Sequence, residues 1–283
     1  METHHAHHDH PDADADLAEL LELDAQVLHS YLSDVTSWVR RLAGELPVRR
    51  VLDLGCGTGN GTFALARCFE AADLIALDQS TEMLGRLEIK ARQLGLADRI
   101  RTLQADLDLE WPGIDPVDVV WASNSLHHLA DPDRVLAKIF TTIRPGGILA
   151  VAELGSFPRF LPDDIGLGQP GLEARCHAAV AGQMAHSLPH LGSDWSPRLR
   201  RAGFTVAAEQ PFVINLTPPL PASTGRYARA SLQRIRSGLH DQLTADDLAA
   251  LDTLISSTGP DGVLRRDDLT VRALRTAWVA RRP

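Results

Sequence analysis

Alternating glycines behind an aspartate form the segment of this sequence that is best suited to hold a ligand. Glycine recurs at every second position from residue 55 to residue 61, beginning two residues after Asp53. The segment follows the apolar run 51–54 and leads into residues 63–67, which have helical spacing. Glycine reaches backbone conformations that other residues avoid and lets a ligand approach backbone amides closely. We therefore predict a ligand site at a turn between a buried strand and a helix.

Spacing argues against two phosphate-binding motifs at this turn. A dinucleotide fingerprint, G-x-G-x-x-G, would need its third glycine where Asn60 or Thr62 stands, so it fails in both frames. A P-loop needs a lysine directly after its last glycine, and no lysine lies nearby. An NAD(P)-dependent oxidoreductase therefore fits the glycines poorly. It stays open as an alternative, as does a catalytically silent nucleoside-binding or regulatory protein.

Near-continuous apolar runs alternate with helical segments and indicate a parallel sheet covered on both faces. Ligands of such sheets bind at the carboxyl ends of the strands. Asp78 ends the run 73–77 and follows Gly59 by roughly 20 residues, the distance at which an acid can accept hydrogen bonds from a ribose diol. Asp78 is therefore expected to contact a ribose, with a helix beginning just beyond it.

The D-x-G-x-G-x-G arrangement of Asp53, Gly55, Gly57 and Gly59 resembles the first motif of the class I S-adenosylmethionine-dependent methyltransferases. The resemblance is strong over about residues 47–155 and rests elsewhere on the order of elements. In that family the turn passes against the methionine and ribose parts of S-adenosyl-L-methionine, and the acid helps to hold the ammonium group. The resemblance implies a Rossmann-like, doubly wound α/β sheet of seven strands. It is mostly parallel, with an antiparallel last strand between the fifth and the sixth.

The resemblance also implies which residues contact the cofactor. Asp106 follows the strand 99–104 and is expected to accept a hydrogen bond from the adenine amino group, since an ionised carboxylate is only an acceptor. Asp108 is the less favoured neighbour. The expected cofactor-binding residues are Asp53, Gly55, Cys56, Gly57, Gly59, Asn60, Asp78, Gln79, Met83, Ala105, Asp106, Leu107, Ser123 and Asn124.

The strand 117–123 leads into Leu126-His127-His128-Leu129. Methyltransferases that act on exocyclic or amide nitrogens often carry an [N/D/S]-P-P-[Y/F/W] sequence at this point, and this chain does not. This form resembles the small-molecule branch of the family, including quinone-biosynthesis C-methyltransferases and natural-product O-methyltransferases. It implies in-line transfer of a methyl group to a small-molecule acceptor, at oxygen or carbon, with no metal ion. His127 or His128 is the candidate general base, because imidazole can take up a proton near neutral pH.

Residues 17–46 show helical apolar spacing and are expected to form a lid ahead of the catalytic domain, 47–283. Tyr31 and Trp38, on one face of this lid, and Glu153, at the end of the strand 148–153, are expected to contact the acceptor. Helical inserts at about residues 156–200 and 218–260 are expected to form its cap. Residues 1–16 are rich in histidine and aspartate, which is typical of disordered leaders and of metal-binding tracts. No metal site is expected there, since no fold would fix the ligands.

Composition restricts the partners of this 283-residue chain. A formal net charge of −9 argues against a nucleic-acid binder, which usually carries a basic face. No apolar run approaches the length of a membrane span, and a membrane partner is not expected. Three cysteines without C-x-x-C spacing suggest a reducing compartment, so a cytoplasmic location is expected, with a homodimer as a possible assembly.

Overall fold

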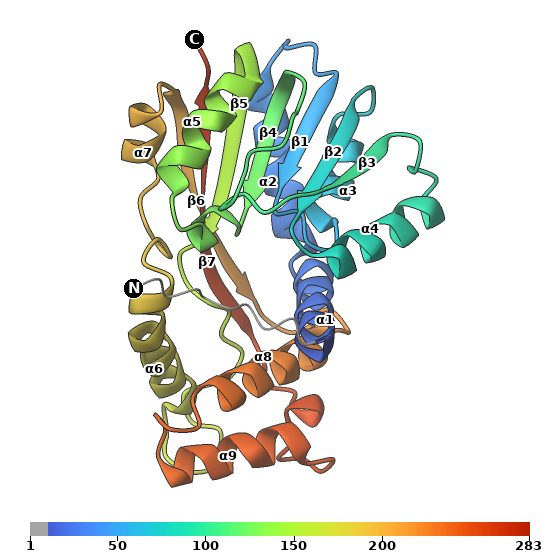
Figure 1. Ribbon diagram of the computed structural model, residues 1–283. Helices are drawn as coiled ribbons and strands as arrows, with labels where there is room; N and C mark the ends of the chain where they lie inside the picture. The colour runs from blue at the N-terminus through green and yellow to red at the C-terminus, as the bar shows by residue number, and fades with distance from the viewer. Residues whose placement is uncertain (1–10) are drawn as a thin grey trace.

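A computed structural model describes residues 11–283, which form a seven-stranded sheet with strand order β3-β2-β1-β4-β5-β7-β6 (Figure 1). Strands β1 to β5 run parallel, and β7 pairs antiparallel with both β5 and β6. The expected Rossmann-like fold, with the last strand between the fifth and sixth, is confirmed. The strands are Arg50–Leu54 (β1), Asp73–Asp78 (β2), Ile100–Gln104 (β3), Val117–Ser123 (β4), Ile143–Leu154 (β5), Thr205–Leu216 (β6) and Val271–Arg281 (β7).

Helices cover both faces of the sheet, because the central strands carry apolar side chains on both sides. One face packs on α2, α3 and α4 through residues such as Val39, Leu65 and Leu87. The other packs on α5 and α7 through Leu136, Ile139 and Leu199. These helices are His29–Ala43 (α2), Asn60–Cys68 (α3), Thr81–Gln93 (α4), Pro132–Thr142 (α5) and Ser196–Arg201 (α7), and the short 3-10 turn η1 spans Leu126–His128.

A second, mainly helical layer lies beyond the carboxyl ends of the parallel strands (Figure 1). The β6–β7 hairpin extends into this layer, and α1 packs against α8 within it. We call the carboxyl ends of β1 to β5, with the residues that directly follow them, the carboxyl rim. The layer comprises Pro11–Val27 (α1), Leu172–Ser187 (α6), Thr224–Gly238 (α8), Ala245–Ser256 (α9) and the 3-10 turn Val263–Arg265 (η2).

Two local boundaries differ from the sequence expectation. The segment 144–147, which precedes the expected strand 148–153, lies inside β5 as an irregularity in its pairing with β4. It is held there because Gly146 N donates to Arg282 O and Arg282 N donates to Gly147 O. Helix α1 begins at residue 11, inside the expected leader, and the Ser80 hydroxyl donates to Asp14 in its first part. Residues 1–10, which carry the histidines of that leader, lie outside the described residues.

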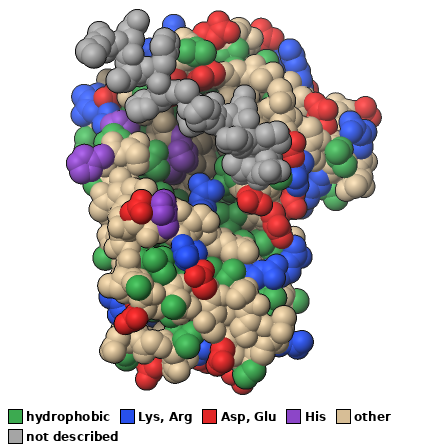
Figure 2. Space-filling model, turned by 60° about the horizontal axis from the view of Figure 1, so that its bottom comes forward, with side chains coloured by type: hydrophobic (Ala, Val, Ile, Leu, Met, Phe, Trp, Pro, Cys, Tyr) green, Lys and Arg blue, Asp and Glu red, His purple; other side chains and the backbone are tan. Residues whose placement is uncertain are grey.

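On the face shown in Figure 2, lysine and arginine side chains are interspersed with aspartate and glutamate. Between residues 11 and 283, every helix is too short or too polar to cross a membrane.

Candidate functional site

The glycine turn between β1 and α3 has the backbone geometry that its sequence predicts. Gly55, Gly57 and Gly59 have φ angles of 65°, 52° and 84°, in the left-handed region that favours glycine. The amides of Gly55 and Cys56 both donate to Leu77 O, at 2.8 and 3.0 Å, which holds the turn against the end of β2. At Gly55 a Cβ atom would lie 2.5 Å from the Cβ of Ser125, so the loop after β4 also requires glycine there.

Asp78 forms part of the scaffold of this turn. Its Oδ2 accepts from Gly57 N at 2.8 Å, and its Oδ1 accepts from Ser80 N at 3.0 Å. Burial raises the pKa of the Asp78 carboxyl, against the hydrogen bonds that lower it. Each carboxylate oxygen keeps a further lone pair, so the expected contact with ribose hydroxyls is compatible with these bonds and stays a prediction.

Asp53 lies beneath the turn and is only 2% exposed. Its Oδ2 accepts from the Thr62 hydroxyl at 2.6 Å, a partner that the sequence interpretation missed. Burial raises the pKa of Asp53 to about 7. Its expected contact with the ammonium group of the cofactor stays a prediction, because the carboxylate faces the first turn of α3 here.

The next two strand ends bring further expected residues to the carboxyl rim. After β3, Ala105 N donates to Asp78 O at 3.1 Å, and Asp106 Oδ1 accepts from Asp108 N at 2.9 Å. After β4, which ends at Ser123, Asn124 has a positive φ of 51° and its amide donates to Ala152 O. The side-chain oxygens of Asn124 and Ser125 are buried and have no protein partner. A bound molecule could therefore satisfy them.

Of the two candidate bases, His127 is buried and paired, whereas His128 is exposed. His127 Nδ1 forms a hydrogen bond with Glu153 Oε2, and the other oxygen of Glu153 accepts from Leu126 N at 3.0 Å. The two histidine rings lie 4.2 Å apart between centroids. Both oxygens of Glu153 thus position η1 and its imidazole, and the expected contact of Glu153 with the acceptor stays a prediction.

Helix α1 covers the glycine turn, and the role of residues 17–46 as a lid stays a prediction. A Cβ atom on Gly57 would approach the Leu21 side chain to 3.1 Å, and Asn60 Nδ2 donates to Leu21 O at 3.2 Å. Of the other expected cofactor contacts, Met83 is buried and Gln79 is exposed at the start of α4. Cys56 is buried within the turn, and burial raises the pKa of its thiol.

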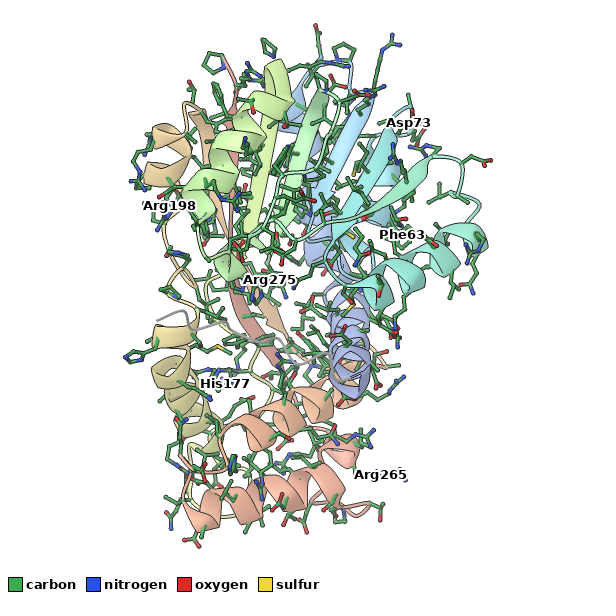
Figure 3. All side chains as sticks on the ribbon, viewed as in Figure 1. Phe63, Asp73, His177, Arg198, Arg265 and Arg275 are labelled. Carbon is green, nitrogen blue, oxygen red and sulfur yellow. The ribbon has the colours of Figure 1, made fainter. Side chains whose placement is uncertain are left out.

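A buried ion pair that the sequence interpretation missed lies beside the end of β5. Arg275, on β7, pairs in register with Leu154 and is 4% exposed. Its Nη2 donates to Asp24 Oδ1 on α1, and the Tyr227 hydroxyl donates to the same oxygen at 2.6 Å. Figure 3 shows Arg275 where the sheet meets the helical layer. One signal was available: Arg275 shares its strand parity with the buried, apolar 273 and 277 positions.

The two aromatic residues expected at the acceptor both pack against the sheet, and one of them, Tyr31, also lies against this ion pair. Tyr31 and Trp38 both pack edge-on against Phe212 of β6, with ring centroids 5.5 and 6.0 Å away. Tyr31 also lies under the guanidinium of Arg275, whose Cζ is 4.9 Å from the ring centroid. Tyr31 is therefore next to the end of β5, and no such rim contact is found for Trp38 within residues 11–283.

The carboxyl rim has the donors and acceptors that an adenosyl amino acid would need. The glycine turn offers a close backbone approach, Asp78 and Asp106 offer carboxylate oxygens, and the unpartnered oxygen of Asn124 is buried at the same edge. These residues fit S-adenosylmethionine. Fold and site together define a nucleoside-binding α/β domain with a covering helix.

Comparison with known proteins shows which domain the central part of the chain resembles. Residues 52–149 match the family described as "Methyltransferase domain". The chain is 38% identical to a trans-aconitate 2-methyltransferase of Deinococcus radiodurans, over 40% of this chain and 41% of that protein. It is 34% identical to the 27-O-demethylrifamycin SV methyltransferase of Amycolatopsis mediterranei, over 50% of this chain and 56% of that protein. The chain thus matches about half the length of these curated relatives.

Solved structures show the same fold over most of the chain. A candidate methyltransferase of Bacillus halodurans aligns over 88% of this chain and 98% of its own, with a TM-score of 0.56 and 16% identity. A phosphoethanolamine N-methyltransferase of Haemonchus contortus, in complex with S-adenosylhomocysteine, aligns over 88% and 52% with a TM-score of 0.50 and 16% identity. Over residues 52–149 the chain thus resembles the methyltransferase domain, and its fold is that of the class I S-adenosylmethionine-dependent methyltransferases.

Proposed function

We propose that this protein transfers the methyl group of S-adenosylmethionine to a hydroxyl group of a small-molecule acceptor. The observation that carries the proposal is the His127–Glu153 pair, which lies on the same rim as the glycine turn. Methyl transfer needs a nucleophile aligned with the methyl group, and a hydroxyl acceptor also needs a group that removes its proton. This site combines a cofactor turn with an oriented imidazole.

Each residue has a definable task in this reaction. S-adenosylmethionine, when bound, supplies an electrophilic methyl group on a sulfonium. Glu153 accepts a hydrogen bond from His127 Nδ1–H. This leaves Nε2 as the ring nitrogen that can take the hydroxyl proton. Because Glu153 is itself held by Leu126 N, the imidazole is fixed before an acceptor arrives. Helix α1, closing over the turn, excludes water from the transfer.

The relatives support a small acceptor without fixing it. Trans-aconitate methyltransferases, the rifamycin methyltransferase and ubiquinone-biosynthesis O-methyltransferases are among the proteins that the chain resembles. The acceptors in their names are small molecules, and two of these names specify O-methylation. Transfer to carbon remains the variant of this proposal in which His127 would matter less. The expected cytoplasmic location and homodimer also stay predictions.

The test is a two-stage assay. Calorimetry with S-adenosylmethionine and with NADH first establishes the cofactor, and we expect binding of the former alone. The protein with S-adenosylmethionine is then offered a panel of phenols, quinols and carboxylic acids, and formation of S-adenosylhomocysteine is measured with the mass of the product. Binding of NADH but not S-adenosylmethionine would refute the proposal.

The two adjacent histidines provide a matched pair of variants. His127→Ala should lower turnover of a hydroxyl acceptor about 10²- to 10⁴-fold, the usual contribution of a general base, with cofactor affinity nearly unchanged. His128→Ala should retain most of the turnover. Equal turnover of both variants and the wild type would remove His127 from the mechanism. Loss in both to the same extent would indicate a structural role for η1.

A further inference from the structure

Arg275 occupies an unusual position, because a guanidinium is buried at the edge of the proposed acceptor site. It is 4% exposed on the face of β7 that otherwise packs in the main core. Its charge is compensated by Asp24 of the covering helix, whose side chain is 23% exposed. The exposed part of the cluster is thus Asp24, on α1, and Arg275 lies beside Leu154, the residue that follows Glu153.

Two hydrogen-bonding groups of this cluster are unsatisfied within the protein. Arg275 Nε and the Tyr31 hydroxyl are both buried without a hydrogen-bond partner. The guanidinium lies close enough to lower the pKa of Tyr31, against the larger effect of burial that raises it. Leaving a buried donor unpaired is costly, so such groups usually have a partner in the functional complex.

The chemistry of the two groups defines the missing partner. An arginine N–H can only donate, and a tyrosine hydroxyl can donate as well as accept. One oxygen atom that accepts hydrogen bonds would satisfy both. Because Tyr31 belongs to α2 and Arg275 to β7, this oxygen would connect the helical cover to the sheet directly beside the rim.

The surrounding charges select among the oxygens that could bind. Asp24 already neutralises Arg275, and the charge of Glu153 reaches Tyr31, where it raises the pKa. A carboxylate of the acceptor would therefore add a negative charge where carboxylates are already in excess, at a considerable desolvation cost.

We propose that Arg275 Nε and the Tyr31 hydroxyl bind an uncharged oxygen of the acceptor, a carbonyl, hydroxyl or ether, and that Asp24 disfavours a carboxylate at this point. This inference rests on the proposed function and narrows its substrate class. It places the acceptor among neutral oxygenated molecules. A tricarboxylate such as trans-aconitate, named for one of the relatives, would meet an arginine that is already paired.

The experiment compares matched probes that differ only in the group of interest. The full chain is titrated calorimetrically with 4-hydroxyacetophenone and 4-hydroxybenzoate, and with 6-hydroxy-2-acetonaphthone and 6-hydroxy-2-naphthoate. Each titration is made with and without saturating S-adenosylhomocysteine. The titration with S-adenosylhomocysteine itself reports on the proposed function. The ratio of the affinity for the ketone to the affinity for the carboxylate tests this inference, even if the chain binds no cofactor.

We expect at least one ketone to bind about tenfold or more tightly than its carboxylate, the ratio for one well-placed hydrogen bond or one unfavourable charge. Tyr31→Phe and Arg275→Lys should each weaken ketone binding about tenfold. Asp24→Asn should raise the affinity for the carboxylate to about that for the ketone or above it. Glu19→Gln is the matched control, since it breaks the exposed α1–α8 ion pair with Arg226 and should leave the ratio unchanged.

Several outcomes would overturn the inference. Carboxylates that bind the wild type as tightly as their ketones would show that Asp24 does not select against charge. Ketone affinity that is unchanged in folded Tyr31→Phe and Arg275→Lys proteins would show that these groups do not hold the oxygen. Absence of binding by both ketones would also count against it. Thermal unfolding curves establish that each variant is folded.

Discussion

Replacing Asp53 with asparagine should stabilise the protein at pH 8 and change its stability little at pH 4. Burial raises the pKa of Asp53 to about 7, despite the hydrogen bond from Thr62, which lowers it. In the unfolded chain an aspartate titrates near pH ~3.9. A group whose pKa is raised by folding contributes stability that is fully present below the unfolded pKa and is lost as the pH rises through the folded pKa. Ionised Asp53 therefore destabilises the native state.

The magnitude follows from the difference between the two pKa values. About three pKa units at 1.36 kcal/mol each correspond to roughly 4 kcal/mol, lost progressively between about pH 4 and pH 7. Asparagine carries no charge over this range, and its side-chain oxygen can still accept from the Thr62 hydroxyl. The free energy of unfolding of Asp53→Asn should therefore exceed that of the wild type by up to roughly 4 kcal/mol at pH 8.

Urea unfolding from pH 4 to pH 8, followed by circular dichroism, measures this difference. The comparison of variant with wild type cancels other carboxyls with raised pKa values, such as Glu173. Asp78 is close enough to raise the pKa of Asp53, so an Asp53→Asn, Asp78→Asn double variant separates the two. Asp73→Asn, at an exposed position, is the control and should give a flat difference. A flat difference for Asp53→Asn, or a loss of stability at pH 8, would refute the reasoning.

Three further predictions concern the turn and the covering helix. Gly55→Ala should destabilise more than Gly95→Ala: both positions have φ near +65°, costing about 1–2 kcal/mol, but only at Gly55 would the new Cβ meet another side chain, at 2.5 Å. Urea unfolding checks this, and equal costs would contradict it. Asp78→Asn should lower the free energy of unfolding by about 1–3 kcal/mol in the same assay. The amide nitrogen of asparagine cannot accept, so one of the two hydrogen bonds from backbone amides is lost. The substitution should also weaken S-adenosylhomocysteine binding in calorimetry, and unchanged affinity would remove Asp78 from the site. Tyr227→Phe should cost about 2 kcal/mol by removing the hydrogen bond to Asp24, and a neutral effect would show that this bond contributes little.

The sheet could be predicted because its information is local. Each of the central strands is an apolar run bounded by turn residues, and three of the alternating glycines have the positive φ values that explain their spacing. The expected strand 117–123 coincides with β4. The position of β7 between β5 and β6 came from the family resemblance, because no local pattern specifies which edge a strand joins.

The polar contacts around the acceptor site could not be predicted in the same way. Asp24 and Arg275 are 251 residues apart, and only the folded chain brings them together. Each nevertheless interrupts an apolar pattern: Asp24 falls at helical spacing with Leu17, Leu21 and Leu28, and Arg275 falls among the buried positions of its strand. Since isolated buried charges are costly, two such interruptions of opposite sign are a usable signal for a buried pair.

The covering helix links the two halves of the site through contacts at different positions along its length. Near its start Asp14 accepts from Ser80, in its middle Leu21 lies over the glycine turn, and towards its end Asp24 pairs with Arg275. A stiff helix that is lifted from the glycine turn also disturbs its ion pair at the acceptor side. Entry of the cofactor and entry of the acceptor are therefore expected to break the same contacts of α1. A substitution at Asp24 should be read for its effect on both ligands, because a change in cofactor affinity alone would not show a direct contact with the cofactor.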